Sequence, residues 1–165
     1  MINKNEQGRT MLEMLGVIAI MGIITFGAIT GINYGMTSYK ISQTYNEVQN
    51  TIEGVKDLYS WSKVYPSDAS KIKGVVEDND VFPGAKVGDY FKGQFGKVDI
   101  QPIDGGYNFA VIYYGINGDD CERLINLDWE TSFIEAKVIS CTGDCQSTDK
   151  CGGEDSVNTL SFSPI

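Results

Sequence analysis

The sequence predicts an α+β protein in which a long N-terminal α-helix packs on a C-terminal antiparallel β-sheet. Three observations support this fold class. An apolar run of helical length lies near the N-terminus, an apolar stripe with helical spacing follows it, and β-type runs separated by turn residues fill the C-terminal half. The chain has 165 residues, enough for one compact domain with an extended appendage.

The N-terminal apolar run has the length of a membrane helix. Between Glu13 and Lys40 the chain contains no Asp, Glu, Lys or Arg. At about 1.5 Å per residue, such a run crosses a hydrocarbon core about 30 Å thick. A cleaved secretory signal would have a shorter apolar region followed by a small-residue cleavage site. We therefore expect a membrane helix rather than an ordinary signal peptide.

Glu13 stands at the head of this run, where it has two interpretations. An ionised carboxylate at the centre of a bilayer costs about 2–4 kcal/mol, so an acid kept near lipid indicates a partner. Alternatively, Glu13 lies at headgroup level and is stabilised by the dipole of the helix start. The spacing of the apolar residues does not choose between the two.

Glycines are frequent in the same run. Gly27, Gly31 and Gly35 follow a G-x-x-x-G spacing, which lets two helices approach closely. Each glycine lowers helix stability by about 1 kcal/mol relative to alanine, so this density predicts a segment able to stretch during packing. The alternative is the ordinary glycine content of a membrane helix.

Beyond Lys40 the sequence predicts an amphipathic continuation of the helix. Polar residues such as Glu47 occupy the other faces, and the apolar stripe consists of Ile41, Tyr45, Val48, Ile52, Val55 and Tyr59. A coiled-coil seam is the alternative, but a globular sequence follows that needs a core helix, so we favour packing within the molecule. Pro66 is expected to stop the helix.

A loop and a hairpin are predicted next. Residues 67–97 are rich in Gly, Asp and Lys, which predicts an irregular surface loop with one short helical turn near Ser70–Val76. Its aromatic residues Tyr90 and Phe91 are candidates for adhesion or subunit contacts, with burial as the alternative. The runs 98–103 and 107–114 flank the sequence Asp-Gly-Gly, which is a strong hairpin signal.

The C-terminal third is expected to add a short helix and a final strand. Asp119 is placed to cap a helix that runs through Cys121 and Ile125. The segment SFIEAKVIS fits a helix or a strand, and NTLSFSPI fits a last strand.

All the cysteines also lie in this third, at Cys121, Cys141, Cys145 and Cys151. An even number of cysteines in one hydrophilic region suits two disulfides formed outside the cytoplasm. The alternative is a structural zinc site, because four thiolates can close a tetrahedral shell, although the usual CxxC pairs are missing. The residues alone leave all three disulfide connectivities open.

Composition argues against several functions. The formal charge of −9 and the pI near 4.4 make nucleic acid an unfavourable partner. Histidine is absent, which removes the commonest general base and transition-metal ligand. The sequence gives little support for acid–base catalysis, because nothing in it orients the candidate acids Asp119, Asp120 and Glu122. We expect no enzymatic activity, no cofactor and no metal.

The hexapeptide GRTMLE at residues 8–13, followed by the apolar run, resembles the class III signal of type IV pilins. In that family a short polar leader ends in Gly, and the mature chain carries Glu at its fifth position. The resemblance implies a leader of residues 1–8, cut between Gly8 and Arg9 by a prepilin peptidase that also methylates the new amino group. Arg9 differs from the family's usual Phe or Met.

The resemblance also gives Glu13 a role in assembly. In the family, this glutamate meets the amino terminus of a neighbouring subunit as the filament grows. Each charge alone is penalised in an apolar core, and the pair offsets much of that penalty. The implied division is a membrane and filament-core helix at residues 9–40 and a globular head at residues 41–165. The family's helix-bending proline, which would fall near Thr30, is missing, and glycine is its expected substitute.

The segments FGKVDI, YNFAVIYYGI, CERLI and NTLSF resemble the head of type IVb pilins, especially the major pilins of thin pili. In those proteins a disulfide links the short helix to the region before the last strand. The resemblance therefore implies a Cys121–Cys151 pair, leaving Cys141 with Cys145. Closing a loop of about 30 residues is worth about 3–4 kcal/mol.

The function implied by the resemblance is that of a structural subunit. It would wait in the inner membrane of a bacterium and then polymerise with identical subunits into an extracellular filament for adhesion, mating contact or motility. The membrane, the prepilin peptidase and the assembly machinery would be its other partners.

Two alternatives to a pilus subunit stay open. One is a type II secretion pseudopilin, a kind of head that often binds calcium through C-terminal acids, here Asp144, Asp149, Glu154 and Asp155. These acids equally suit a solvated loop. The other alternative is a membrane-anchored extracytoplasmic domain of different function.

Overall fold

The computed structural model describes residues 4–62, 64–129, 133–143, 150–153 and 156–165, with side chains from residue 11 onward. It divides the chain into two compact units, residues 1–39 and 40–165. We refer to residues 11–39 as the apolar segment and to residues 40–165 as the head.

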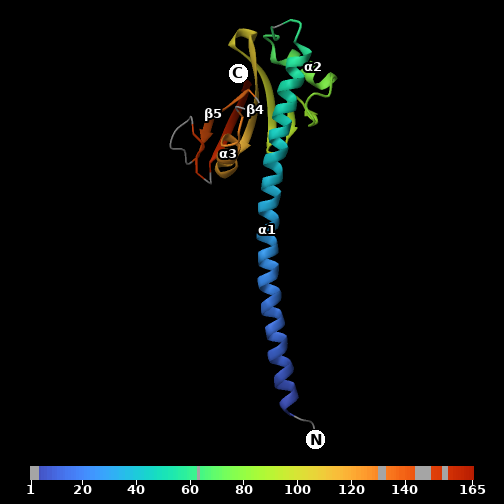
Figure 1. Cartoon of the computed structure of the whole chain (residues 1–165), viewed down its shortest axis with the longest axis vertical. Coiled ribbons are helices and arrows are strands. Elements are labelled where there is room, and N and C mark those ends of the chain that lie inside the picture. Colours follow the sequence, from blue (N-terminus) through green and yellow to red (C-terminus); the bar gives the residue numbers. More distant parts are fainter. Residues whose placement is uncertain (1–3, 63, 130–132, 144–149, 154–155) are drawn as a thin grey trace. The chain divides into compact units, whose positions relative to one another are not determined.

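Helix α1 spans Lys4–Leu58 and contributes its last five turns to the head. There the predicted stripe lies in the core: Ile41, Val48, Ile52 and Val55 are buried, and the two tyrosines of the stripe pack against them. The prediction that this stripe packs within the molecule is confirmed. Figure 1 shows this part of α1 beside the strands of the head.

Pro66 was the wrong stop signal, because α1 ends at Leu58. The chain then makes a tight turn in which the Ser62 amide donates to the Tyr59 carbonyl at 3.1 Å. Farther on, the Tyr65 amide donates to the Gly106 carbonyl at 2.7 Å. This bond ties the connection to the sheet, so a tertiary contact accompanies the change of direction that we assigned to proline.

The sheet is antiparallel, has six strands and follows the order β1-β2-β3-β4-β6-β5. The strands are β1 Lys86–Val87, β2 Tyr90–Gly93, β3 Gly96–Ile103, β4 Asn108–Ile116, β5 Ile134–Thr142 and β6 Val157–Pro164. The predicted α+β fold is therefore observed, with a long N-terminal helix packed on an antiparallel sheet.

The predicted hairpin is formed by β3 and β4, joined by the 3-10 turn Asp104–Gly106. Gly105 and Gly106 have φ angles of 69° and 92°, a region that glycine adopts without steric penalty. The final strand is also confirmed, as β6. The ambiguous segment SFIEAKVIS forms strand β5, in which Ile134 and Val138 point into the core while Glu135 is exposed.

The predicted irregular loop at 67–97 contains more regular structure than its composition indicated. Helix α2 spans Ala69–Asp78, and the Asp68 side chain caps it by accepting from the Ser70 amide at 2.9 Å. Ile72 and Val76, one helical turn apart, are buried, and this short stripe lies among the Gly and Asp residues that predicted a loop.

Phe91, considered as a surface contact residue, is instead part of the core. Its side chain is 2% exposed and its ring lies 5.2 Å from that of Phe82. Tyr90, the neighbouring residue on β2, is half-buried. The alternation of a strand explains the difference, since successive side chains point to opposite faces.

Helix α3 spans Gly118–Ile125. Its cap is Asn117 rather than the expected Asp119: the Asn117 Oδ1 accepts from the Asp120 amide at 2.8 Å. Leu124 and Cys121 on this helix are buried in the same core as Phe162 of β6. Helix α3 therefore packs on the face of the sheet that carries the core.

Candidate functional site

The apolar segment of α1 exposes its large apolar side chains on every side. Each of these side chains is between 51% and 77% exposed, and they are Met11, Leu12, Met14, Leu15, Val17, Ile18, Ile20, Met21, Ile23, Ile24, Phe26, Ile29, Ile32, Tyr34, Met36 and Tyr39. A helix that is apolar all round is stable when lipid or other helices surround it. By length and composition, α1 can cross a membrane.

Glu13 is exposed on this segment and heads a shallow recess along one side of the helix. Met14, Val17, Ile18 and Met21 line the rest of the recess. The only charge between residues 11 and 39 is thus surrounded on its own helix by apolar side chains. When lipid or other helices cover this surface, an ionised carboxylate here requires an opposite charge from another molecule.

The predicted packing glycines lie on one side of α1. Gly27, Gly31 and Gly35 are four residues apart, and a Cβ added at any of them would meet nothing within 4 Å. The side is open for a second helix to approach. The hydroxyls of Thr25 and Thr30 do not disturb the apolar surface, because each donates to a carbonyl of the preceding turn.

The predicted processing residues Gly8 and Arg9 lie inside α1, which begins at Lys4. The helix therefore runs through the expected boundary without a break. Their side chains lie outside the part of the chain whose side chains the structure describes.

In the head, a disulfide joins Cys121 of α3 to Cys151, which precedes β6. This is the pair that the family resemblance implied. Cys141, at the end of β5, is also disulfide-bonded. Cys145 lies outside the described residues, as do the acids Asp144, Asp149, Glu154 and Asp155 considered for calcium.

The disulfide region depends on close backbone packing. A Cβ on Gly118 would lie 2.2 Å from the Gly153 carbonyl oxygen, and one on Gly152 would lie 2.7 Å from the sulfur of Cys141. Asn158, fully buried on β6, accepts from the Gly152 amide at 3.0 Å and donates to the Ile116 carbonyl at 3.2 Å. Asn158 thus connects β4 with the loop that the disulfide closes.

Glu47, predicted to lie on a polar face of α1, is instead buried against the sheet and 6% exposed. Its Oε2 accepts from the Tyr113 hydroxyl at 3.1 Å, and its Oε1 accepts from Gln94 Nε2 at 2.9 Å. Burial, together with the Glu47 charge and hydrogen bond, raises the pKa of Tyr113 well above its ordinary value. Thr44 and Thr51 lie on the same side of the helix as Glu47 and are buried too. These two small residues, one helical turn before and after Glu47, were the sequence signal that could have predicted its burial.

Lys73 of α2 is a second charged residue whose burial the sequence did not reveal. Its Nζ lies 2.9 Å from Asp89 Oδ1 and 3.2 Å from Asp99 Oδ1, and the lysine side chain is 4% exposed. Burial lowers the pKa of Lys73, but the hydrogen bonds and charges of the two aspartates outweigh it and raise the pKa. The hydrogen bond and charge of Lys73 lower the pKa of Asp89. Lys73 thus ties α2 to β3 through Asp99 and to the turn before β2 through Asp89.

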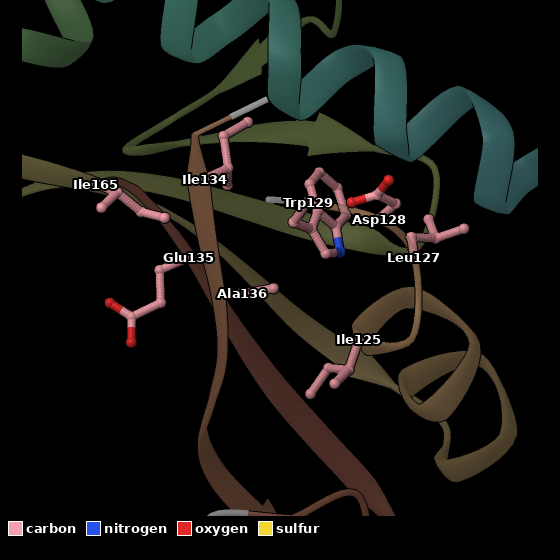
Figure 2. Close-up of a pocket in the computed structure, with 8 residues that line it drawn as sticks. All are labelled: Ile125, Leu127, Asp128, Trp129, Ile134, Glu135, Ala136 and Ile165. Atoms are coloured by element: carbon pink, nitrogen blue, oxygen red, sulfur yellow. The ribbon is translucent and has the colours of Figure 1, made fainter. Parts of the chain in front are cut away.

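A pocket of about 370 Å³ lies between α3 and β5 (Figure 2). It is lined by Ile125, Leu127, Asp128, Trp129, Ile134, Glu135, Ala136 and Ile165. The indole of Trp129 donates to the Leu124 carbonyl at 2.7 Å, and its ring lies 4.8 Å from that of Phe162. The lining combines aliphatic and aromatic side chains with the carboxylates of Asp128 and Glu135, so it offers both apolar contacts and negative charge.

The acids considered for catalysis lie on α3, and one of them takes part in its N-terminal cap. Asp120 accepts from the Asn117 side-chain amide at 2.8 Å, while Asp119 and Glu122 are exposed on the helix surface. Within the described ranges, no group of three or more Asp, Glu, Cys or His side chains is placed to hold a metal ion.

In comparisons with known protein families and with curated proteins, the chain matches none. The functional argument therefore rests on the chain's own residues, above all on the exposed apolar segment.

Proposed function

We propose that this protein is the structural subunit of a type IV pilus. It is made as a membrane precursor, cut between Gly8 and Arg9, and polymerised with identical copies through the apolar segment of α1 into an extracellular filament. The head is then displayed outside the cell, where its disulfides form.

The observation that carries the proposal is the exposure of every large apolar side chain between Met11 and Tyr39. At roughly 25 cal/mol for each Å² of apolar surface removed from water, this surface drives the segment into lipid or against other helices. In the membrane precursor, lipid covers this apolar surface. In the filament core, the helices of other copies cover it. The sequence GRTMLE supplies the signal for passage from one to the other.

Glu13 gives the filament its register under this proposal. Inside a bundle of apolar helices, the Glu13 carboxylate and the free amino group of Arg9 on a neighbouring copy each lose their contact with water, which costs free energy. Pairing the two charges offsets much of that cost. Subunits displaced by one helical turn would leave both charges unpaired. The side marked by Gly27, Gly31 and Gly35 lets the helices come close.

The test is the intact mass and N-terminal sequence of the protein in filaments sheared from the surface of its native host. We expect a chain that begins at Arg9, carries a methyl group on its amino terminus and lacks four hydrogens because of two disulfides. A chain found only in the membrane fraction and beginning at Met1 would overturn the proposal in favour of a membrane-anchored domain of another function.

A further inference from the structure

The charges of this chain are divided unevenly along its length. Residues 1–98 contain ten Lys and Arg against ten Asp and Glu, whereas residues 99–165 contain three against twelve. The whole net charge of −9 therefore belongs to the C-terminal part, which includes α3, β5 and β6. The N-terminal part, which includes β1, β2 and α2, is neutral.

Two lysines form an exposed basic row in the neutral part. Lys92 on β2 and Lys97 on β3 are direct cross-strand partners, and both are exposed. Like charges in this arrangement destabilise a sheet. Two other lysines near these strands are paired with acids: Lys73 binds Asp89 and Asp99, and Lys86 binds Glu77.

The basic row has no close ion pair among the described residues, although the charge of Lys97, after those of Lys73 and Lys86, contributes to lowering the pKa of Asp89. Among the described residues, no carboxylate oxygen lies within 4.0 Å of the ammonium of Lys92 or Lys97. The Lys97 ammonium lies 5.2 Å from the centre of the Tyr90 ring and 5.0 Å from that of Tyr114. Two aromatic rings thus position a cation at the surface of an acidic protein.

An exposed acidic pair lies on α3 in the other half of the head. Asp119 and Glu122 are three residues apart on this helix, so they share one side of it, and both are exposed. The sheet order separates β2 and β3 from β6 and β5, and α3 packs on the core face. Lys97 alternates with the buried Val98, so its row belongs to the opposite face.

We propose that the row of Lys92 and Lys97 docks the exposed acidic side of α3, led by Asp119 and Glu122, of a second copy of this chain. The two surfaces lie on opposite faces and opposite halves of one head, so they cannot meet within one molecule. A contact between two different surfaces of identical subunits is heterologous, and it propagates into a ring or a filament. The inference rests on the proposed function and adds a head-to-head contact to it.

Charge reversal tests the docking surface. We expect the variant Lys92→Glu/Lys97→Glu to lower the yield of sheared filaments by at least about tenfold, because it places like charges in contact. The matched control is Lys71→Glu/Lys150→Glu, which changes the net charge equally at exposed lysines outside the row. Adding Asp119→Lys/Glu122→Lys to the first variant should restore the yield.

Near-ultraviolet circular dichroism of each variant, with the full chain solubilised in detergent, verifies that the head is folded. A folded Lys92→Glu/Lys97→Glu variant with normal filament yield would overturn the inference. If that variant also lost binding to an anionic polysaccharide, the row would bind a polysaccharide instead of a second copy, and the inference would still be overturned. If Asp119→Lys/Glu122→Lys failed to restore the yield, the proposal that Asp119 and Glu122 contact the basic row would be wrong.

Carbodiimide cross-linking tests the contact without a substitution, because this reagent joins only a lysine and a carboxylate that touch. Filaments made from isotope-labelled and unlabelled copies should give mixed peptides that join Lys92 or Lys97 to Asp119 or Glu122. Mixed peptides that join these lysines only to other acids would contradict the contact.

The outcome separates this inference from the proposed function. Wild-type filaments that lack the mixed peptides contradict the docking alone. If the wild type makes no filament, the proposed function fails, and the docking is tested on the concentrated full chain in detergent. Mixed peptides at low salt that disappear at high salt would then support it, and their absence at low salt would contradict it.

Discussion

Glu13 and Glu47 are both acids on helix α1 that face apolar surroundings, but they differ in where a partner is found. Glu47 accepts hydrogen bonds from Tyr113 and Gln94 of its own head. Glu13 lies among Met14, Val17 and Ile18 of its own helix, with every large apolar neighbour exposed. The head thus binds its buried acid within one molecule, whereas the apolar segment leaves its large apolar side chains exposed. Under the proposed function, lipid and then other copies cover them.

The difference separates two kinds of experiment. A substitution in the apolar segment should change assembly and leave the stability of the head unaltered. A substitution in the core of the head should change its free energy of unfolding first, and assembly only through the loss of folded protein.

The largest effect is expected for Glu13→Ala. It should lower the yield of sheared filaments by at least about tenfold, since breaking a buried ion pair costs about 3–5 kcal/mol. Membrane insertion and the urea midpoint of the detergent-solubilised chain should be unchanged. Glu53→Ala, at an exposed acid of α1 in the head, is the control and should assemble normally. Normal filament yield from Glu13→Ala would refute the pairing role.

The next effect concerns the head alone. Replacing Cys121 and Cys151 together by serine should lower its free energy of unfolding by about 3–4 kcal/mol, because the bridge spans a sequence separation of 30 residues. Urea titration followed by tryptophan fluorescence measures this, with Trp129 as the core reporter. Insertion of the apolar segment into the membrane should not change. A midpoint equal to that of the wild type would show that this bridge does not stabilise the head.

Glu47→Ala should destabilise the head by about 2–3 kcal/mol, because it leaves the buried Tyr113 hydroxyl without its acceptor. Glu47→Gln should recover part of the loss, since an amide oxygen still accepts one hydrogen bond. The same urea titration gives both values. Equal stability of Glu47→Ala and the wild type would mean that the buried acid is not part of what holds α1 to the sheet.

The smallest effect is a pH dependence from the Lys73 pair. The pKa of Asp89 is lower in the folded state than its ordinary 3.8, so its stabilisation is complete above that pH and is lost as pH falls through the folded value. The pKa of Lys73 is higher than its ordinary 10.5, so its stabilisation is complete below that pH and is lost as pH rises through the folded value.

Thermal unfolding across both pH ranges checks these losses, with Lys73→Met as the comparison. The variant should lack the acid loss due to Asp89. Part of the alkaline loss should persist in it, because the pKa of Tyr113 is also raised, chiefly by burial. An unchanged acid limb in Lys73→Met would exclude the pair as its source.

Patterns of short range were sufficient to predict much of this fold. The stripe on α1, the Asp-Gly-Gly hairpin and the last strand depend on neighbours in sequence, and all three are observed. The end of α1 at Leu58 was missed, and a bond from Tyr65 to Gly106, about 40 residues away, accompanies the change of direction that follows it. Local reasoning has no access to such a contact.

Buried charges were the other class of error. Glu47 and Lys73 look like surface residues by type, and only the sheet residues opposite them make burial favourable. The capping of α3 by Asn117 rather than Asp119 is a smaller error of the same origin, because both residues are good caps and the path of the chain decides between them. The role that we propose for Glu13, by contrast, involves a second molecule and is testable only in an assembly.

The position of β6 affects how this protein is made. It is the last strand along the chain, yet it lies between β4 and β5, and β5 pairs with no other strand. Under the proposed function, the apolar segment enters the membrane first during export, while the sheet stays open at β4 until residues 157–164 arrive. Until then β4 presents an unpaired edge that could capture a strand of another chain. A crowded precursor pool of the kind we propose would therefore need either rapid completion of each head or a chaperone that covers this edge.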